Sequence, residues 1–185
     1  MDDPREPVPD QVLVERVQRG DRDAFEALCE RYLPIVYNRL RALLPPEAVE
    51  DVTQEVFVAV LRGIQRYRGR SLFRTWLSGV IRHKVADYYR RRHRHSREIA
   101  LEEGFQGGRA DGWEEQAHVR MALYRLPARY QEVLLLRFVE GRSFSEIAEI
   151  LDISLEAAKS RYRRAVRALA REMGCDRSGK RGDSR

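Results

Sequence analysis

The segment from Ser143 to Leu169 constrains the fold more than any other part of the chain. Its sequence, SFSEIAEILDISLEAAKSRYRRAVRAL, predicts two short helices joined by a tight turn, with a capping box at Ser143 and Glu146 and a second N-cap at Ser154. Two helices in this arrangement form a helix-turn-helix, a common way to place an α-helix in the DNA major groove. A charged helix in an ordinary bundle is the alternative. The caps, the turn and the basic face agree with one another, which favours the helix-turn-helix.

The second of these two helices carries a basic face. Arginine and lysine reach guanine edges and phosphates, and serine donates to either, so this face is a candidate DNA-contact surface. Its candidate contact residues are Lys159, Ser160, Arg161, Arg163, Arg164 and Arg167. The apolar side of the same helix is expected to be buried and consists of Ala158, Tyr162, Ala165, Val166 and Leu169.

The charge of the chain is positive and unevenly distributed. A net charge of +6 and a pI near 9.6 point to a polyanionic partner. Residues 62–97 hold twelve Lys or Arg against one acid, whereas residues 98–116 hold six acids against one arginine. Residues 155–185 are basic again, with ten bases and four acids. Two basic blocks separated by an acidic one indicate two nucleic-acid-facing regions on one chain.

The apolar spacing is helical nearly throughout, and the alternation typical of strands is absent. We therefore expect an all-α fold of two small helical domains joined by a flexible linker. The predicted boundaries are a first domain over residues 10–95, an acidic linker over 96–116, a second domain with the helix-turn-helix over 117–173, and a disordered tail over 174–185. Within the first domain, a helical segment is predicted over 10–44, with a capping box formed by Asp23 and Glu26 just before its apolar series.

A second helix, predicted over residues 46–66, has two distinct sides. Its expected buried stripe is Val49, Val52, Val56, Phe57, Val60, Leu61 and Ile64. The other side carries Asp51, Gln54 and Glu55, which share one patch because they are spaced i, i+3 and i+4. From spacing alone, this acidic patch is as consistent with a protein contact as with exposure to water.

A loop and a third helix, predicted over residues 72–92, interleave aromatic and basic side chains. Such mixtures bind single-stranded nucleic acid, because cations track phosphates while bases meet aromatic faces. The loop residues Tyr67, Arg68, Arg70 and Ser71 are the better candidates for this role. The third helix is expected to bury its own apolar stripe, which is Phe73, Trp76, Leu77, Val80, Ile81, Val85 and Tyr88.

Catalytic and metal chemistry have little support. The chain has no nucleotide-binding glycine loop, no nucleophile elbow and no paired-carboxylate site, so we expect no enzymatic activity and no cofactor. His83, His93 and His95 with Cys29 lack the ligand spacing of a zinc site, and no metal is expected. The two cysteines form no disulfide framework and the N-terminus does not resemble a signal peptide, which favours a cytoplasmic location in a bacterium.

Taken together, the sequence resembles a sigma factor of the small extracytoplasmic-function (ECF) group, over roughly residues 10–172. The stretches that carry the resemblance are DAFEALCERY, EDVTQEVFVAVLRGIQRYRG, SLFRTWLSGVIRHKVADYYRRR and LPARYQEVLLLRFVEGRSFSEIAEILDISLEAAKSRYRRA. The order of these stretches is specific to the group, whereas many regulators carry a helix-turn-helix alone.

The resemblance implies roles for three sets of residues. Asp51, Gln54, Glu55 and Phe57 match the helix that grips the coiled coil of the largest subunit of core RNA polymerase. The second set matches the region that captures the non-template strand of the −10 element, with one base flipped into a pocket, and consists of Tyr67, Arg68, Arg70, Ser71, Arg82, His83 and Arg90. The basic face of the last helix matches the reader of the −35 element. The chain departs from the family at His83, where asparagine is frequent, and at Glu156-Ala157-Ala158, where Gly-Thr-Val is usual.

The predicted function is therefore that of an alternative sigma factor. It would bind core RNA polymerase, recognise the −35 and −10 elements in double-stranded and melted promoter DNA, and stabilise strand opening. The resemblance also implies control by an anti-sigma factor. The alternative is a dimeric helix-turn-helix regulator in which residues 10–95 form an effector domain, but such a domain has no need of Arg68, Arg70 and Arg90–Arg92.

Overall fold

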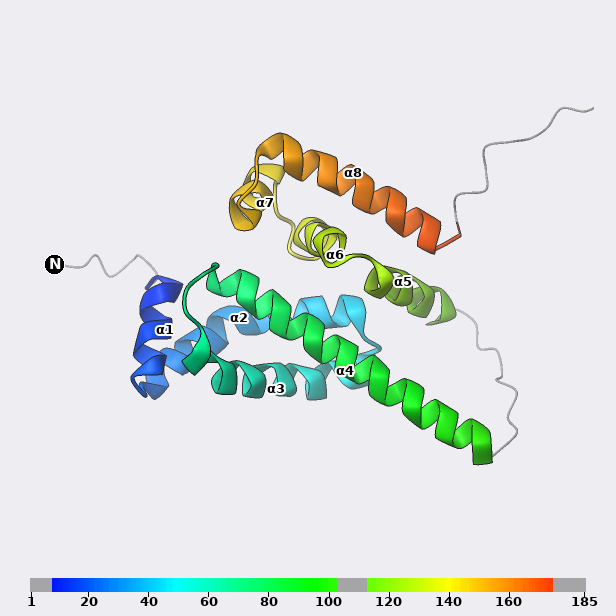
Figure 1. Ribbon diagram of the computed structural model, residues 1–185, viewed down its shortest axis with the longest axis horizontal. Coiled ribbons are helices and arrows are strands. Elements are labelled where there is room, and N and C mark those ends of the chain that lie inside the picture. Colours follow the sequence, from blue (N-terminus) through cyan, green and yellow to red (C-terminus); the bar gives the residue numbers. More distant parts are fainter. Residues whose placement is uncertain (1–7, 103–112, 175–185) are drawn as a thin grey trace, which may run out of the picture. The chain divides into compact units, whose positions relative to one another are not determined.

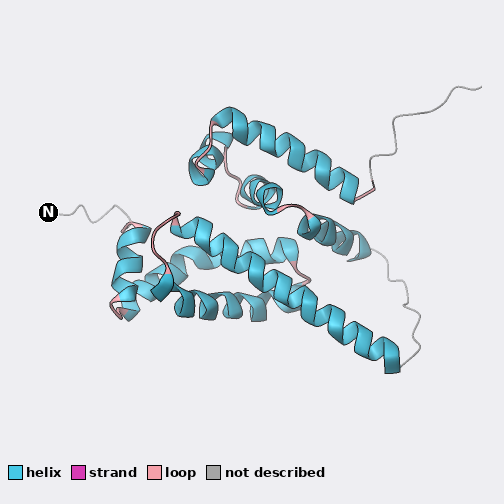
Figure 2. Cartoon of the chain, viewed as in Figure 1, coloured by secondary structure: helices cyan, strands magenta, loops and turns pink. Residues whose placement is uncertain are grey.

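The computed structural model describes residues 8–102 and 113–174, and every regular element among them is helical (Figures 1 and 2). The predicted all-α fold of two helical domains is confirmed. The first elements are α1 (Asp10–Gln18), α2 (Arg22–Leu43), α3 (Pro46–Gly63), the short 3₁₀ turn η1 (Ile64–Arg66) and α4 (Phe73–Glu102). They are followed by α5 (Trp113–Arg125), α6 (Ala128–Leu134), the π-helical turn η2 (Leu135–Val139), α7 (Phe144–Leu151) and α8 (Leu155–Glu172).

The chain divides into two compact units. The first comprises the chain up to Leu40 together with Glu47–Arg92, and the second comprises the chain from His93 onward together with Arg41–Pro46. The exact domain boundaries expected from the sequence remain predictions.

The first unit begins with two helices where the sequence predicted one series. Gly20 adopts a φ of +90°, a left-handed conformation that glycine tolerates without steric cost, and it separates α1 from α2. The Oδ1 atom of Asp21 then accepts a hydrogen bond from the backbone N–H of Ala24 at 3.1 Å. The N-cap of α2 is therefore Asp21. The capping box predicted at Asp23 and Glu26 is wrong, because the N-cap lies two residues before Asp23. Asp23 instead lies in the first turn of α2, where its negative charge interacts favourably with the positive end of the helix dipole.

The buried stripes of α3 and α4 are narrower than their sequences suggest. On α3, Val52, Val56 and Val60 are buried as predicted, as is Ile64 at the start of η1, whereas Leu61 is 50% exposed. On α4 the buried residues follow an i, i+4 spacing and are Phe73, Leu77, Ile81, Val85 and Tyr89. The predicted core residues Trp76, Val80 and Tyr88 are only half-buried. On both helices, apolar residues beside the buried positions remain partly exposed.

The predicted linker is partly helical. Helix α4 continues beyond the expected end at residue 92 to Glu102, and α5 begins at Trp113. Residues 96–102 and 113–116, which the sequence assigned to the linker, therefore belong to helices. Residues 103–112 lie outside the described part of the chain, as does the predicted tail beyond Gly174.

The second unit contains the predicted helix-turn-helix. Ser143 Oγ accepts from the Glu146 N–H at 3.2 Å, and Glu146 Oε2 accepts from the Ser143 N–H at 2.8 Å, so the predicted capping box is present. Ser154 Oγ accepts from the Ala157 N–H at 3.2 Å and caps α8 as predicted. Between the helices, Asp152 adopts a φ of +51°, which turns the chain sharply. Aspartate is among the few residues other than glycine that adopt this conformation readily.

One π-helical turn alters the packing ahead of this motif. In η2 the N–H of Glu140 donates to the carbonyl of Leu135, five residues earlier, at 3.1 Å. The wider turn advances the helix by an extra residue and changes which side chains face the core. Leu136 is fully buried, whereas Phe138 is 68% exposed.

Candidate nucleic-acid and protein interfaces

Helix α8 presents a continuous basic face. Arg163, Arg164 and Arg167 are exposed, while Lys159, Ser160 and Arg161 are half-buried along its borders. The opposite side is anchored by Ala158, Ala165 and Ala168, which are buried. Val166, predicted to be in the core, is 39% exposed, since it lies between the buried line and the basic face. A small-residue anchor brings the backbone of α8 close to its neighbours and leaves the long cationic side chains to face outward.

Two local contacts orient side chains on this face. Arg164 Nη2 donates to Ser160 Oγ at 3.0 Å, one helical turn away. Lys159 Nζ lies 2.9 Å from Glu156 Oε1, and this ion pair lowers the pKa of Glu156. Lys159 is thus partly neutralised within the helix, whereas Arg163 and Arg167 extend from the exposed face.

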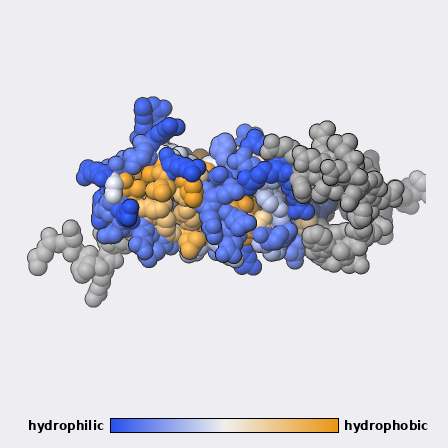
Figure 3. Space-filling model, turned by 90° about the horizontal axis from the view of Figure 1, so that it is seen from below, coloured by the Kyte–Doolittle hydropathy of each residue, from blue (hydrophilic) through white to orange (hydrophobic). Residues whose placement is uncertain are grey.

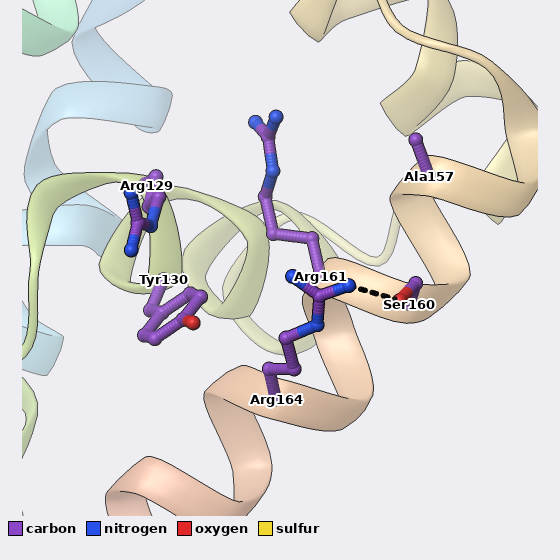
Figure 4. A pocket seen from close by; sticks show the side chains of 6 residues that line it. All are labelled: Arg129, Tyr130, Ala157, Ser160, Arg161 and Arg164. Carbon is purple, nitrogen blue, oxygen red and sulfur yellow. Dashed lines mark hydrogen bonds between the residues drawn. The ribbon is translucent and has the colours of Figure 1, made fainter.

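A pocket of about 400 Å³ lies beside the basic face, between α6 and α8. It is lined by Arg129, Tyr130, Ala157, Ser160, Arg161 and Arg164. Figure 4 shows Arg129 and Tyr130 on α6 at one side of the pocket and the arginines of α8 at the other. Sequence reasoning predicted Arg161 and Arg164 as DNA contacts and missed Arg129, because it lies 32 positions before Arg161 and in a different helix.

An ion pair lies at the start of α7, the first helix of the helix-turn-helix. Arg142 Nη1 lies 2.8 Å from Glu146 Oε1, so Glu146 belongs to both the capping box and an ion pair. The hydrogen bond from the Ser143 backbone, followed by the bond from Arg142, lowers the pKa of Glu146 to about 2. Glu146 therefore stays ionised well into the acidic range and keeps α7 capped.

In the first unit, the loop between η1 and α4 forms a second basic pocket. It has a volume of about 330 Å³ and is lined by Arg66, Tyr67, Arg68, Arg70, Ser71 and Trp76. The four loop residues predicted from the sequence are therefore brought together. Arg66 and Trp76 join them, although Trp76 was predicted to be part of the core.

Tyr67 forms the inner wall of this pocket and is not a freely exposed stacking platform. Its side chain is only 9% exposed, and its hydroxyl donates to the carbonyl of Ser71 at 2.5 Å. Burial raises the pKa of its phenol, which therefore stays neutral. Its ring lies 5.5 Å from that of Trp76 and 6.0 Å from that of Phe73, in an aromatic cluster that also includes Tyr32. The aromatic cluster fixes the floor of the pocket, while the arginines surround its opening.

Helix α1 holds the loop in place. Gln18 Nε2 donates to the carbonyl of Ile64 at 2.8 Å and to the carbonyl of Tyr67 at 2.9 Å. Helix α1 is itself attached to α2, because Asp10 accepts hydrogen bonds from Arg31 and from the Tyr32 hydroxyl. The first nine-residue helix therefore serves as a brace for the basic pocket.

Three further residues predicted to contact the −10 element lie along α4. Arg82, His83 and Arg90 are exposed, and none of them lines the loop pocket. Arg90 pairs with Asp87, and the hydrogen bond from Arg90 lowers the pKa of Asp87. The structure thus separates the predicted set into a pocket group at residues 67–71 and a strip along α4.

Helix α3 presents a mixed acidic and apolar face. Asp51 and Gln54 are exposed as predicted, and Phe57 is half-buried at the border. Glu55 is engaged within the unit, since it lies 3.3 Å from Lys84 Nζ and 2.9 Å from Arg91 Nη2 of α4. Val58 and Leu61, which are 47% and 50% exposed, follow Gln54 on the same side. Figure 3, which is seen from below relative to Figure 1, shows a hydrophobic area bordered by hydrophilic residues.

The described residues give no support for a metal site or a membrane helix. Among the side chains of residues 8–92 and 116–174, no three of the types His, Cys, Asp and Glu gather closely enough to hold a metal ion. The side chains of His93 and His95 lie outside this range. Within the described part of the chain, no helix is both long enough and apolar enough to cross a lipid bilayer.

Comparison with known proteins identifies the family. The sigma-70 region 2 family matches residues 28–95, and the sigma-70 region 4 family matches residues 117–169. The chain is 34% identical over 179 residues to the ECF RNA polymerase sigma-E factor of Escherichia coli K12, covering 89% of this chain and 94% of the relative. It is 30% identical over 181 residues to the sigma-E factor of Haemophilus influenzae, covering 86% and 93%.

A solved structure with the same fold extends the comparison. The structure of CnrH in complex with the cytosolic domain of CnrY aligns with a TM-score of 0.55 and 26% identity, covering 90% of this chain and 98% of that chain. The matches span both helical units in the same order, which a dimeric helix-turn-helix regulator would not produce. The chain therefore belongs to the sigma-70 family and is a sigma factor of the extracytoplasmic-function group.

Proposed function

We propose that this sigma factor directs core RNA polymerase to promoters through three surfaces, each formed by residues of one unit. The observation that carries the proposal is the occurrence of two basic pockets on one chain, one in each unit, together with an exposed acidic and apolar helix face. A protein that bound only one short duplex site would have no need of this combination.

The basic face of α8 reads the −35 element in the major groove. The support is the order of the motif: a capped α7, a sharp turn at Asp152, and a capped α8 whose exposed arginines project from a buried alanine line. Such a helix presents cationic side chains to base edges while its partner helix lies across the DNA backbone. Arg163, Arg164 and Arg167 are the principal contacts, with Lys159, Ser160 and Arg161 at the borders.

The loop pocket accepts a base from the −10 element. Flipping a base out of the stack costs a few kcal/mol, so the receiving site must exist before the base arrives. The aromatic floor and the hydrogen bonds from Gln18 support such a preformed site, because both hold the loop without a ligand. Arg66, Arg68 and Arg70 would contact the phosphates of the captured strand, and the exposed Arg82, His83 and Arg90 would extend the contact along α4.

The exposed face of α3 binds core polymerase. The carboxylate of Asp51 would be repelled by the phosphates of DNA, so this face is not a DNA-binding surface. The neighbouring Val58 and Leu61 are exposed and give the face the apolar content of a protein interface. A helix of the largest polymerase subunit is the expected partner. Glu55 has an additional role within the unit, because its ion pairs join α3 to α4.

We further propose that the chain acts in the bacterial cytoplasm under the control of an anti-sigma factor. A similar chain, CnrH, was solved in complex with the cytosolic domain of another protein. Two basic pockets and one acidic and apolar face would have to be covered to silence all three activities. A partner that covers only one of these surfaces would leave the others free.

Reconstitution with core RNA polymerase tests the function. The chain and core enzyme are mixed with a randomised library of double-stranded DNA, and the sequences bound by the complex are enriched and used as transcription templates. We expect enrichment of two conserved blocks with a fixed spacing, and initiation at a defined distance downstream without added ATP hydrolysis. Enrichment of a single palindromic block, or initiation that does not depend on the chain, would contradict the proposal.

A further inference from the structure

The pocket between α6 and α8 concentrates positive charge. Three of its lining residues, Arg129, Arg161 and Arg164, carry guanidinium groups, and no carboxylate is among the residues that line it. Like charges gathered around one cavity repel each other, and an anion placed between them removes that repulsion. The chemistry of this lining is therefore that of a site for an anion.

Two of the three arginines are partly preorganised. Arg164 donates to Ser160 Oγ at 3.0 Å, and the guanidinium of Arg129 lies over the Tyr130 ring, 5.1 Å from its centroid. A stacked or hydrogen-bonded guanidinium loses less conformational freedom when it binds a ligand, and its planar fork matches the oxygens of a phosphate. The hydroxyl groups of Ser160 and Tyr130 supply two further donors at the same pocket.

The pocket borders the DNA-reading face. Ser160 and Arg164 belong both to the basic face of α8 and to the pocket, and Ala157, Ser160 and Arg164 follow one edge of that helix at i, i+3 and i+7. A helix in the major groove has a phosphate backbone along each side. Arg129 faces this edge from α6, across the pocket from α8 (Figure 4).

We propose that Arg129 is a DNA-contact residue. Together with Arg161 and Arg164 it holds one phosphodiester group of the backbone that flanks the −35 element, and it fixes the register of α8 without reading a base. This inference rests on the proposed function, because it needs α8 to lie in the major groove. It adds a contact from α6, which lies outside the helix-turn-helix.

Arg129→Ala in the full chain, reconstituted with core polymerase, tests the assignment. Arg125→Ala is the matched control, since Arg125 is an exposed arginine of the same unit that does not line the pocket. The affinity for a promoter selected by the wild-type complex is measured by fluorescence anisotropy at several salt concentrations. Loss of one phosphate contact is expected to reduce the slope of log affinity against log salt concentration by about 0.9. This change in slope makes the variant bind roughly eightfold more weakly than the wild type at 0.1 M salt, in addition to any difference in affinity that remains when both are extrapolated to 1 M salt.

A phosphate contact carries no sequence information, so Arg129→Ala is expected to weaken binding to a promoter with a mutated −35 element by the same factor. Probes with single neutral methylphosphonate linkages locate the phosphate: one linkage should weaken the wild-type complex but cause no further loss in the Arg129→Ala complex. The Arg125→Ala complex should be weakened by that linkage by the same factor as the wild-type complex.

An unchanged salt slope for Arg129→Ala, or additive losses at every methylphosphonate position, would overturn the inference while leaving the proposed function intact. The same holds if the variant binds promoters normally but loses affinity for core polymerase, because the pocket would then hold a protein carboxylate. If the wild-type complex selects no promoter at all, the proposed function itself fails.

Discussion

Individual side chains decide how the ends of the helices are held. The side chains of Ser143 and Glu146 accept hydrogen bonds from each other's backbone N–H groups at the start of α7. At the start of α2, the side chain of Asp21 accepts a hydrogen bond from the backbone N–H of Ala24. A helix terminus leaves several backbone donors without partners, so each of these residues replaces a bond that water would otherwise supply. Their energetic importance is local, because each stabilises one helix end within one unit.

Glu146 makes the second unit sensitive to acid. Its pKa is lowered to about 2, so its ionised form stabilises the folded state above the ordinary value of 4.5. That contribution is lost as pH falls from 4.5 through 2. The free energy of unfolding of Glu146→Gln, measured by urea denaturation, should be below that of the wild type at pH 7 and should converge with it as pH approaches 2. Glu149→Gln, an exposed change in the same helix, should show no such convergence.

Cys29 is expected to be a poorly reactive thiol. Burial, followed by the nearby charge of Glu26, raises the pKa of Cys29, and only the thiolate reacts with alkylating agents. In a Cys175→Ser chain at pH 8, iodoacetamide should label Cys29 several-fold more slowly in the folded protein than in the same protein unfolded by urea. Equal rates in the two states, measured by mass spectrometry, would contradict this assignment. Glu26→Gln should increase the folded-state rate slightly.

At the scale of the helix, the division between buried line and exposed face explains both the fold and its use. The buried positions of α8 are small and those of α4 are large, yet each follows a single row along its helix. Residues outside that row remain available for partners. The exposed apolar residues Val58 and Leu61 on α3 and the exposed arginines on α8 result from the same geometry.

Substitutions on α8 test the direction of its basic face. Arg163→Ala should weaken promoter binding by about 1–3 kcal/mol if the contact is bidentate to a base, and should relax the sequence preference at one position of the −35 element. Arg171→Ala, near the C-terminal end of the same helix, changes the charge equally and is expected to have a smaller effect. Binding is measured with the reconstituted complex on the selected promoter. A larger loss for Arg171→Ala would mean that the C-terminal part of the helix contacts the DNA.

The helices and their caps in the second unit could be predicted because their determinants are local. Ser143, Glu146 and Ser154 act on N–H groups within three residues, so their spacing is sufficient. The N-cap of α2 was assigned to Asp23 instead of Asp21 because Asp23 and Glu26 have the spacing of a capping box, whereas the residue three positions after Asp21 is Ala24. The continuation of α4 to Glu102 was missed because the charge changes from basic to acidic there while the backbone stays helical.

The candidate sites were harder to predict, because they depend on contacts between distant segments. The loop residues 67–71 were identified from their composition, but the burial of Tyr67 depends on Phe73, Trp76 and the hydrogen bonds from Gln18. Arg129 was missed because only the packing of α6 against α8 brings it to the pocket. Leu61 was assigned to the core because it follows Val60 in an apolar run, although a rotation of about 100° from Val60 places it on the exposed side with Val58.

At the scale of the whole molecule, the proposed surfaces belong to different units. The protein-binding face is on α3 and the loop pocket is beside it in the first unit, whereas α8 and its pocket are in the second. Distant sites with no shared partners contribute independently to the free energy of binding. The proposal therefore implies that losses in polymerase binding and in −35 recognition can be separated.

The pair Asp51→Ala with Gln54→Ala should lower the affinity for core polymerase. At saturating core enzyme, the complex that does form should bind the selected promoter with unchanged affinity. Arg163→Ala should show the opposite pattern, and the triple variant should show the sum of both effects. Fluorescence titration gives the first affinity and anisotropy the second, with Glu30→Ala, an exposed change on α2, as the charge control. A simultaneous loss of both activities from either change would argue against separate surfaces.

The wide turn at Leu135–Val139 adds a dimension that composition does not describe. One extra residue there directs Phe138 to the solvent. Deleting a single residue would let the turn close into an ordinary α-helix, because a π-helical turn takes up one additional residue. Relatives that are one position shorter at this turn should therefore lack the exposed aromatic side chain that Phe138 presents here.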